Sequence, residues 1–139
     1  MTTPQPFDLR DIWMFSACSA GQLRTIRKSV EEVQVPAGKV LCEEGKVGRE
    51  FFFIIDGTAS VRRGGRKAAT LGPGQYFGEL SLLDRQPRSA TVTAEMPMRL
   101  LLLDQRRFSG LLDDIPGLAH KLLVAMAGRL READARAFH

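Results

Sequence analysis

Short segments in which apolar and polar residues alternate fill the middle of the chain, from about residue 32 to about residue 103. Apolar positions there recur every second residue or form short runs, and turns containing glycine or proline separate them. Such segments are typical of β-strands. The expected strands cover residues 32–35, 40–43, 50–55, 59–63, 67–71, 76–77, 89–93 and 98–103. Several short strands at regular spacing predict a sandwich or a barrel, because closure leaves few strand edges exposed.

Helical spacing of apolar residues marks the N-terminal part of the chain instead. Residues 9–15 form a short amphipathic piece, whose aromatic side chains are expected to pack on the domain. Ser19 can cap a second helix over residues 20–30. The sequence therefore predicts N-terminal helices over about residues 9–30.

The C-terminal part of the chain is also predicted to be helical. A short helix is expected over residues 105–113, and Asp114 can cap a longer helix that has Pro116 near its first turn. These two helices together cover about residues 105–136. The long helix carries an apolar stripe and a flanking row of smaller residues, which are Leu118, Leu122, Met126, Leu130 and Ala133, and then Ala119, Leu123 and Ala127. A stripe this wide predicts packing on the strands, with one side of the helix left to meet a second copy of the chain.

Composition limits the class of protein. The chain has 139 residues, 44% of them hydrophobic and 26% charged, which is ordinary for one globular domain over residues 1–139. No apolar run reaches the roughly 20 residues needed to cross a bilayer, and the segment 1–8 has no signal-peptide core. Two cysteines, Cys18 and Cys42, do not make a disulfide framework. We therefore expect a cytoplasmic protein that does not associate with a membrane.

A net charge of +4 mildly favours anionic partners. The nearest approach to a basic cluster is formed by four residues, Arg62, Arg63, Arg66 and Lys67. A solvated hairpin rim explains these four residues at least as well as a nucleic-acid surface does.

The segment over residues 75–93 carries the chemistry. Gly78 follows an aromatic pair and opens a short apolar turn of helix, where backbone N–H groups without intrahelical partners can bind an anion. Arg88 stands at the far end of the following loop, and its guanidinium can donate to two phosphate oxygens. Glu79 is suited to hydroxyl groups, as the acidic residue of a dinucleotide site is to a ribose. These groups together indicate a nucleotide whose phosphate lies close to its ribose.

The same segment resembles the phosphate-binding cassette of cyclic nucleotide-binding domains. The matching runs are Phe77-Gly78-Glu79-Leu80-Ser81-Leu82-Leu83 and Pro87-Arg88-Ser89-Ala90-Thr91-Val92. A series of glycine turns ahead of it is also similar to the family, namely Pro36-Ala37-Gly38, Glu44-Gly45, Gly48, Gly57 and Leu71-Gly72-Pro73-Gly74. The resemblance covers about residues 15–130 and implies an eight-stranded β-roll of the jelly-roll type, flanked by helices.

The resemblance also implies the roles of single residues. Arg88 would bind the cyclic phosphate, Glu79 would bind the ribose 2′-hydroxyl, and backbone N–H groups would complete the cradle. The candidate ligand-binding residues are Phe77, Gly78, Glu79, Leu80, Ser81, Arg88, Ser89 and Ala90. The expected ligand is cyclic AMP, because Ser89 stands where relatives selective for cyclic GMP often carry threonine. Cyclic GMP stays open, since serine also offers a hydroxyl group.

The sequence departs from the family pattern at two places. Lys46 and Arg49 stand in a loop where relatives often carry acidic residues, so this loop is expected to differ in conformation. In the long C-terminal helix, Ala133 and Asp134 replace two hydroxyl residues that contact adenine in relatives. Arg131 or Arg136 could stack on the base instead, although plain solvation explains both arginines as well.

Other functions are less well supported. The two histidines, His120 and His139, lie outside the expected barrel, so neither a metal site nor a cofactor is expected. Ser81 and Ser89 have no accompanying base, so we expect no catalysis. The family resemblance implies that the long helix moves on ligand binding and often forms a homodimer. Too few residues follow this helix for a helix-turn-helix, so direct DNA binding by this chain alone is not expected. Two alternatives remain open, a regulatory fragment of a transcription factor or other effector, and a β-roll that has lost its ligand.

Overall fold

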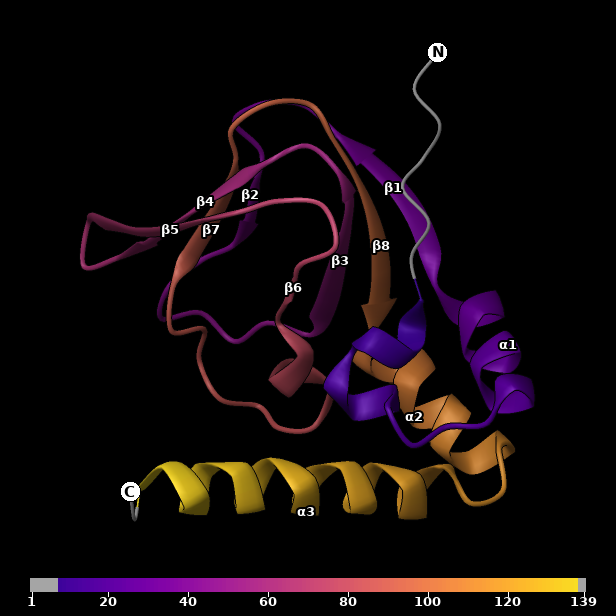
Figure 1. Cartoon of the computed structure of the whole chain (residues 1–139). Coiled ribbons are helices and arrows are strands. Elements are labelled where there is room, and N and C mark those ends of the chain that lie inside the picture. The colour runs from indigo at the N-terminus through magenta and orange to yellow at the C-terminus, as the bar shows by residue number, and fades with distance from the viewer. Residues whose placement is uncertain (1–7, 138–139) are drawn as a thin grey trace.

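A computed structural model describes residues 8–137 and contains a β-roll of two four-stranded antiparallel sheets. The first sheet has the order β1-β8-β3-β6 and the second has the order β2-β7-β4-β5. Figure 1 shows the sheets closing around a common interior, with all α-helices on one side of the roll. The strands are β1 (Glu31–Val35), β2 (Val40–Cys42), β3 (Glu50–Asp56), β4 (Ala59–Arg63), β5 (Arg66–Leu71), β6 (Tyr76–Phe77), β7 (Thr91–Ala94) and β8 (Met98–Asp104). The expected eight-stranded β-roll is confirmed.

The helical elements also occur where the apolar spacing predicts them. They are the 3₁₀-helices η1 (Leu9–Asp11), η2 (Trp13–Phe15) and η3 (Glu79–Leu82), and the α-helices α1 (Ala20–Ser29), α2 (Gln105–Asp114) and α3 (Leu118–Ala137). Ser19 caps α1 as expected, and its hydroxyl accepts from the backbone N–H of Gln22 at 3.2 Å. Gln22 in turn accepts from the N–H of Ser19, which completes a capping box.

Strand β3 separates two apolar cores because its side chains alternate between the two faces of its sheet. Phe51, Phe53 and Ile55 pack in the core that the first sheet shares with the helices. Phe52 and Ile54 point to the other side and pack in the core between the two sheets. The uninterrupted apolar run of this strand therefore reflects burial on both faces.

Helix α3 is covered over only part of its length. Leu118 and Leu122 are buried, whereas Leu123 and Leu130 are 63% and 64% exposed. Figure 1 shows α3 passing below the roll, with its C-terminal end far from α1 and α2. The expectation that the whole stripe packs on the strands is wrong beyond the first turns, because the helix extends past the elements that cover it.

Three local expectations are corrected. Asp114 is the last residue of α2 rather than the cap of α3, because the chain reverses at Gly117, which has a φ of 80°. Strand β7 begins at Thr91, two residues later than expected. The segment 9–15 forms two separate 3₁₀-helices instead of one helical piece.

His139 and residues 1–7 lie outside the described residues. Within residues 8–137, none of the helices combines the length and the apolar character that crossing a bilayer requires.

Candidate functional site

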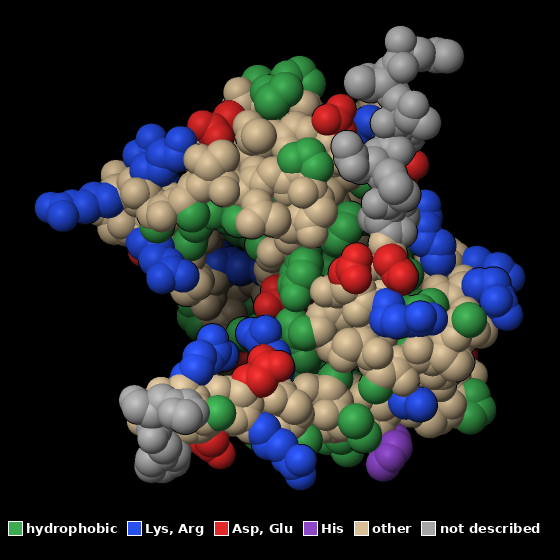
Figure 2. Space-filling model, in the orientation of Figure 1, with side chains coloured by type: hydrophobic (Ala, Val, Ile, Leu, Met, Phe, Trp, Pro, Cys, Tyr) green, Lys and Arg blue, Asp and Glu red, His purple; other side chains and the backbone are tan. Residues whose placement is uncertain are grey.

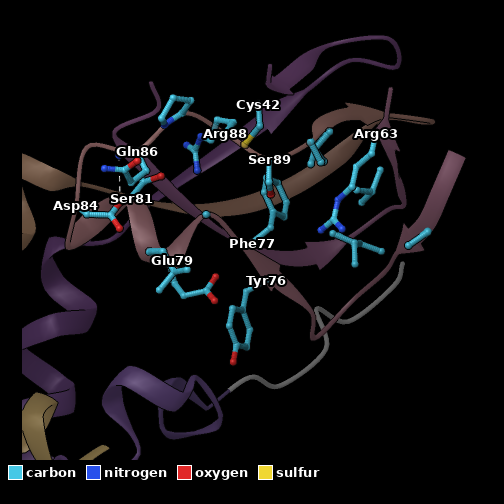
Figure 3. A pocket seen from close by; sticks show the side chains of 18 residues that line it. Cys42, Arg63, Tyr76, Phe77, Glu79, Ser81, Asp84, Gln86, Arg88 and Ser89 are labelled. Carbon is cyan, nitrogen blue, oxygen red and sulfur yellow. Dashed lines mark hydrogen bonds between the residues drawn. The ribbon is translucent and has the colours of Figure 1, made fainter. Parts of the chain in front are cut away.

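A cavity of about 520 Å³ opens between η3, the loop that follows it and the β4–β5 hairpin. Figure 2 shows the molecule hollowed on the side of the hairpin, between the roll and α3, and Figure 3 shows the side chains that line the cavity. All eight candidate residues lie in its wall, which are Phe77, Gly78, Glu79, Leu80, Ser81, Arg88, Ser89 and Ala90. The structure thus brings together residues 77–81 and residues 88–90, which six residues separate in the sequence. It adds lining residues from β2, β4, β5 and β7.

The turn at Gly78 positions the floor of the cavity. Gly78 has a φ of 81° and precedes η3, so the chain changes direction here in a conformation that side chains disfavour. A Cβ atom at this position would lie 2.7 Å from the carbonyl oxygen of Glu50 and 2.5 Å from Nη1 of Arg88. Glycine is therefore required for two reasons, the backbone angle and the close approach of Arg88.

The backbone of Arg88 is fixed by the glycine-containing loop that follows β2. Its N–H donates to the carbonyl of Lys46 at 2.8 Å, and its own carbonyl accepts from Gly45 at 2.9 Å. Val47 and Pro87 add an isolated antiparallel bridge. The loop that contains Lys46 and Arg49 therefore fixes the backbone position of Arg88.

The guanidinium of Arg88 is oriented by the protein but not fully satisfied. Its Nη2 donates to the carbonyl oxygen of Glu50 at 2.7 Å. A Cβ at Gly48 would lie 1.8 Å from Nε of Arg88, so the side chain lies directly against this glycine. The Nε atom itself is buried and has no hydrogen-bond partner among the described residues. Because its contact with Gly48 closes Nε off from solvent, a ligand in the cavity would meet the terminal nitrogens of the guanidinium rather than Nε.

Glu79 lies half-buried in the wall of the cavity, next to Tyr76. Its Oε1 accepts from the indole Nε1 of Trp13 at 3.5 Å. The backbone N–H of Trp13 also donates to the hydroxyl of Tyr76 at 3.4 Å. Figure 3 shows the carboxylate of Glu79 and the ring of Tyr76 on the same side of the cavity. The carboxylate therefore has one long hydrogen bond from the protein and keeps acceptor capacity for a ligand.

Sequence reasoning missed the far end of the cavity, which the β4–β5 hairpin provides. Val61, Ala69 and Leu71 give it an apolar wall, and Arg63 stands beside them (Figure 3). The side chain of Arg63 makes no hydrogen bond or ion pair with any described residue. The alternation of Val61 and Arg63 along β4 could have indicated a shared face, but only the fold shows that this face meets the cassette.

Cys42 also lines the cavity. Burial raises the pKa of its thiol, Arg88 lowers it and Glu50 raises it, and the pKa that results is about 11. The thiol is therefore neutral near pH 7 and is a poor nucleophile or metal ligand. Among residues 8–137, no three His, Cys, Asp or Glu side chains gather to hold a metal ion.

Helix α3 contributes nothing to the wall of the cavity. Arg131, Ala133 and Asp134 are exposed and do not line it. Arg136 donates its Nε to the carbonyl of Glu132 in the same helix at 3.4 Å. The structure therefore does not bring Arg131 or Arg136 to the place where a base could stack.

Known proteins resemble this chain in sequence. The sequence profile of the cyclic nucleotide-binding domain matches residues 32–114. A cAMP-dependent protein kinase regulatory subunit from Mycosarcoma maydis is 34% identical over 122 residues, which are 81% of this chain and 23% of that protein. A cyclic AMP receptor protein from Thermus thermophilus is 39% identical over 104 residues, which are 71% of this chain and 48% of that protein. The chain thus spans less than half the length of these two relatives.

A solved structure shares the fold over nearly its whole length. The N-terminal domain of a transcriptional regulator from Streptomyces coelicolor superposes with a TM-score of 0.80 at 34% identity. The similarity covers 89% of this chain and 90% of that one. The helices at both ends of the chain are therefore part of the shared architecture, along with the β-roll.

Proposed function

The chain belongs to the cyclic nucleotide-binding domain family, and from this premise we propose that it is a sensor domain for cyclic AMP. The observation that carries the proposal is the guanidinium of Arg88, which the Glu50 carbonyl and Gly48 hold in the wall of the cavity. A cyclic phosphate beside it would accept a charge-assisted hydrogen bond from the guanidinium. Two relatives carry cyclic AMP in their names, which favours this ligand over cyclic GMP.

The rest of the cavity fits the remaining parts of the ligand. Glu79 would accept from the ribose 2′-hydroxyl, while backbone N–H groups of Gly78, Leu80, Ser89 and Ala90 would face the phosphate oxygens. The apolar wall and Arg63 lie at the far end, where the base must go once the phosphate is beside Arg88. Adenine and guanine both have apolar faces, so this wall accepts either base. Cyclic GMP therefore remains the second candidate ligand.

The output of binding would pass through α3. Ligand binding would shift the equilibrium between two arrangements of the cassette and α3. The size of the shift is set by the difference in the ligand's affinity for the two arrangements. Leu123, Val124 and Leu130 are exposed on α3, and a second copy of the chain could cover them as a homodimer. Such a domain regulates an effector in the cytoplasm and performs no catalysis of its own. The effector would be a transcription factor or another protein.

The test is titration calorimetry with cyclic AMP on the wild type and on Arg88→Ala. We expect the substitution to weaken binding by roughly 2–3 kcal/mol, because it removes a charge-assisted contact to phosphate. Arg85→Ala is the matched control, because Arg85 is exposed in the same loop and does not line the cavity. Equal affinities of the wild type and Arg88→Ala would reject the assigned role of Arg88. A wild type that binds neither cyclic nucleotide would favour the β-roll that has lost its ligand.

A second titration tests the role of Glu79. Glu79→Ala should weaken cyclic AMP, whereas 2′-deoxy cyclic AMP, which lacks the hydroxyl, should bind both proteins almost equally. If both ligands lose the same affinity, Glu79 does not bind the ribose.

A further inference from the structure

Trp13 lies between the cavity and the C-terminal helix. Its indole Nε1 donates to Oε1 of Glu79 at 3.5 Å, and its backbone N–H donates to the hydroxyl of Tyr76 at 3.4 Å. On the face of the same ring, Cζ of Arg129 lies 4.9 Å from the ring centroid. Trp13 of η2 thus contacts two residues that line the cavity, Glu79 through its side chain and Tyr76 through its backbone, and its ring contacts one residue of α3.

The three contacts support one another electrostatically. The N–H edge of the indole offers a single donor and no acceptor, so this edge suits the carboxylate of Glu79. The guanidinium of Arg129 over the ring face is attracted by the π-system, and it polarises the ring in the sense that strengthens its N–H donor. The positive and the negative group therefore face each other across one half-buried indole.

The position of Trp13 is set by the body of the domain. The neighbouring Met14 and Phe15 are buried in the core that the first sheet shares with the helices. Trp13 itself is partly buried and packs against this core. Glu79, in contrast, belongs to a four-residue 3₁₀-helix that follows a glycine. The indole is thus the anchored partner, and the carboxylate is the group whose position it can fix.

We propose that Trp13 is a positioning residue for the ribose end of the cavity and that it links this end to α3 through Arg129. The proposal rests on the proposed function, because it assigns Glu79 to a ribose hydroxyl. In the free protein the indole holds the carboxylate at the wall of the cavity. When a ligand hydroxyl donates to the same carboxylate, the carboxylate shares its lone pairs between the two donors. Because Arg129 lies on the indole ring, a ligand that favours one position of the indole also favours one position of Arg129, and by thermodynamic linkage the position of Arg129 affects ligand affinity in turn.

The first experiment measures the binding of two ligands by calorimetry. Trp13→Phe keeps an aromatic ring and removes the N–H donor, so it should weaken cyclic AMP by about threefold to tenfold. The same variant should bind 2′-deoxy cyclic AMP as the wild type does, because that ligand makes no use of Glu79. A merely structural role of Trp13 would lower the affinity for both ligands equally, and this result would overturn the proposal.

The second experiment uses the fact that Trp13 is the single tryptophan of the chain. Its fluorescence therefore reports one indole without labelling. In the ligand-free protein, Arg129→Gln and Glu79→Gln should each change the emission. Arg131→Gln should leave it unchanged, because Arg131 is exposed on α3 and the cation over the Trp13 ring is Arg129. Because Arg129 is exposed, its replacement does not endanger folding.

The third measurement adds ligand to these variants. Cyclic AMP should change the emission of the wild type more than 2′-deoxy cyclic AMP does at saturation, and Arg129→Gln should reduce this difference. If Arg129→Gln, Glu79→Gln and the addition of ligand all leave the emission unchanged, the proposed link between the cavity and α3 through Trp13 is wrong. Suppose that the wild type binds cyclic AMP, that Arg88→Ala binds it more weakly, and that Trp13→Phe discriminates between cyclic AMP and 2′-deoxy cyclic AMP as the wild type does. This result would reject the inference about Trp13 and would leave the proposed function standing. A wild type that binds neither ligand would reject the proposed function, and the ribose role of Trp13 with it.

Discussion

Backbone groups form one end of the cavity and side chains form the other. At the end that holds Arg88, the groups in contact are backbone atoms and glycines, namely Gly48, Gly78 and the carbonyl of Glu50. At the other end, side chains of the β4–β5 hairpin form the wall, and Arg63 is exposed and unpaired among the described residues. The first end leaves no space for an added carbon atom, and the second is open to solvent.

This difference separates two kinds of requirement. A cyclic phosphate is the same group in every cyclic nucleotide, so a rigid cradle of backbone and one arginine can serve all of them. The base varies between ligands, and exposed side chains on a hairpin can change without disturbing the fold. Substitutions should therefore have large effects at the Arg88 end and small ones at the hairpin end.

The largest effect is expected for Gly78→Ala. The added Cβ would meet Glu50 and Arg88 and would force a positive φ on alanine, so stability should fall by about 1–3 kcal/mol and cyclic AMP binding should be lost. Gly57→Ala is the control, because Gly57 also has a positive φ, at 92°, and a nearby carbonyl, but does not line the cavity. Thermal unfolding and calorimetry on both variants should show a similar loss of stability but a loss of affinity for Gly78→Ala alone.

The next effect is expected for Gly48→Ala. Its Cβ would overlap only the side chain of Arg88, which can move away, so stability should change little. The displaced guanidinium would no longer reach phosphate, and the affinity should fall by about as much as in Arg88→Ala, roughly 2–3 kcal/mol. Gly72→Ala, where a Cβ would meet nothing within 4 Å, is the control. Unchanged affinity in Gly48→Ala would mean that Arg88 does not need its present position.

Cys42 gives a pH-dependent test of the Arg88 end. The pKa of its thiol is raised from 9.0 to about 11 by burial, so the unfolded chain loses this proton at lower pH than the folded one. The stability that the neutral thiol contributes is complete below pH 9 and is lost as the pH rises through about 11. Stability measured by urea unfolding should therefore fall between pH 8 and pH 11 by about 2 kcal/mol more in the wild type than in Cys42→Ala. An equal fall in both proteins would show that Cys42 is not buried as described.

The smallest effect is expected at the hairpin end. Arg63→Ala should weaken binding of cyclic nucleotides by only about threefold, because an exposed cation contributes little in water. Arg62→Ala is the control on the same strand, since Arg62 does not line the cavity and its Nη1 donates to the carbonyl of Gly65 at 3.4 Å. Calorimetry with cyclic AMP and cyclic GMP would detect the difference. A loss at Arg63 as large as that at Arg88 would contradict the contrast between the two ends.

Most of the fold could be predicted because the signals are local. Alternation along β1 and β4, the glycine turns and the Ser19 cap each depend on residues within a few positions of one another, and the structure confirms them. The candidate ligand residues were also found locally, because the cassette is one continuous segment. Their roles toward a nucleotide stay predictions that the titrations above address.

The expectations that failed concern contacts between distant segments. The stripe of α3 continues to Leu130, yet only Leu118 and Leu122 are buried, because helical spacing does not show where the covering elements end. For Arg131 and Arg136 two alternatives were open, and because both residues are exposed and neither lines the cavity, the structure agrees with plain solvation.

The sequence by itself determined the strands, the flanking helices and the segment that carries Arg88 and Glu79, because strand alternation, turns and caps act between neighbouring residues, and the family resemblance implied that the strands form a β-roll. Only the tertiary structure decided that Gly48 and the Glu50 carbonyl orient Arg88, that the hairpin closes the cavity, and that Trp13 lies between Glu79 and Arg129. The physical reason is that these contacts join residues tens of positions apart, and the chain path that brings them together is set by the packing of the whole domain.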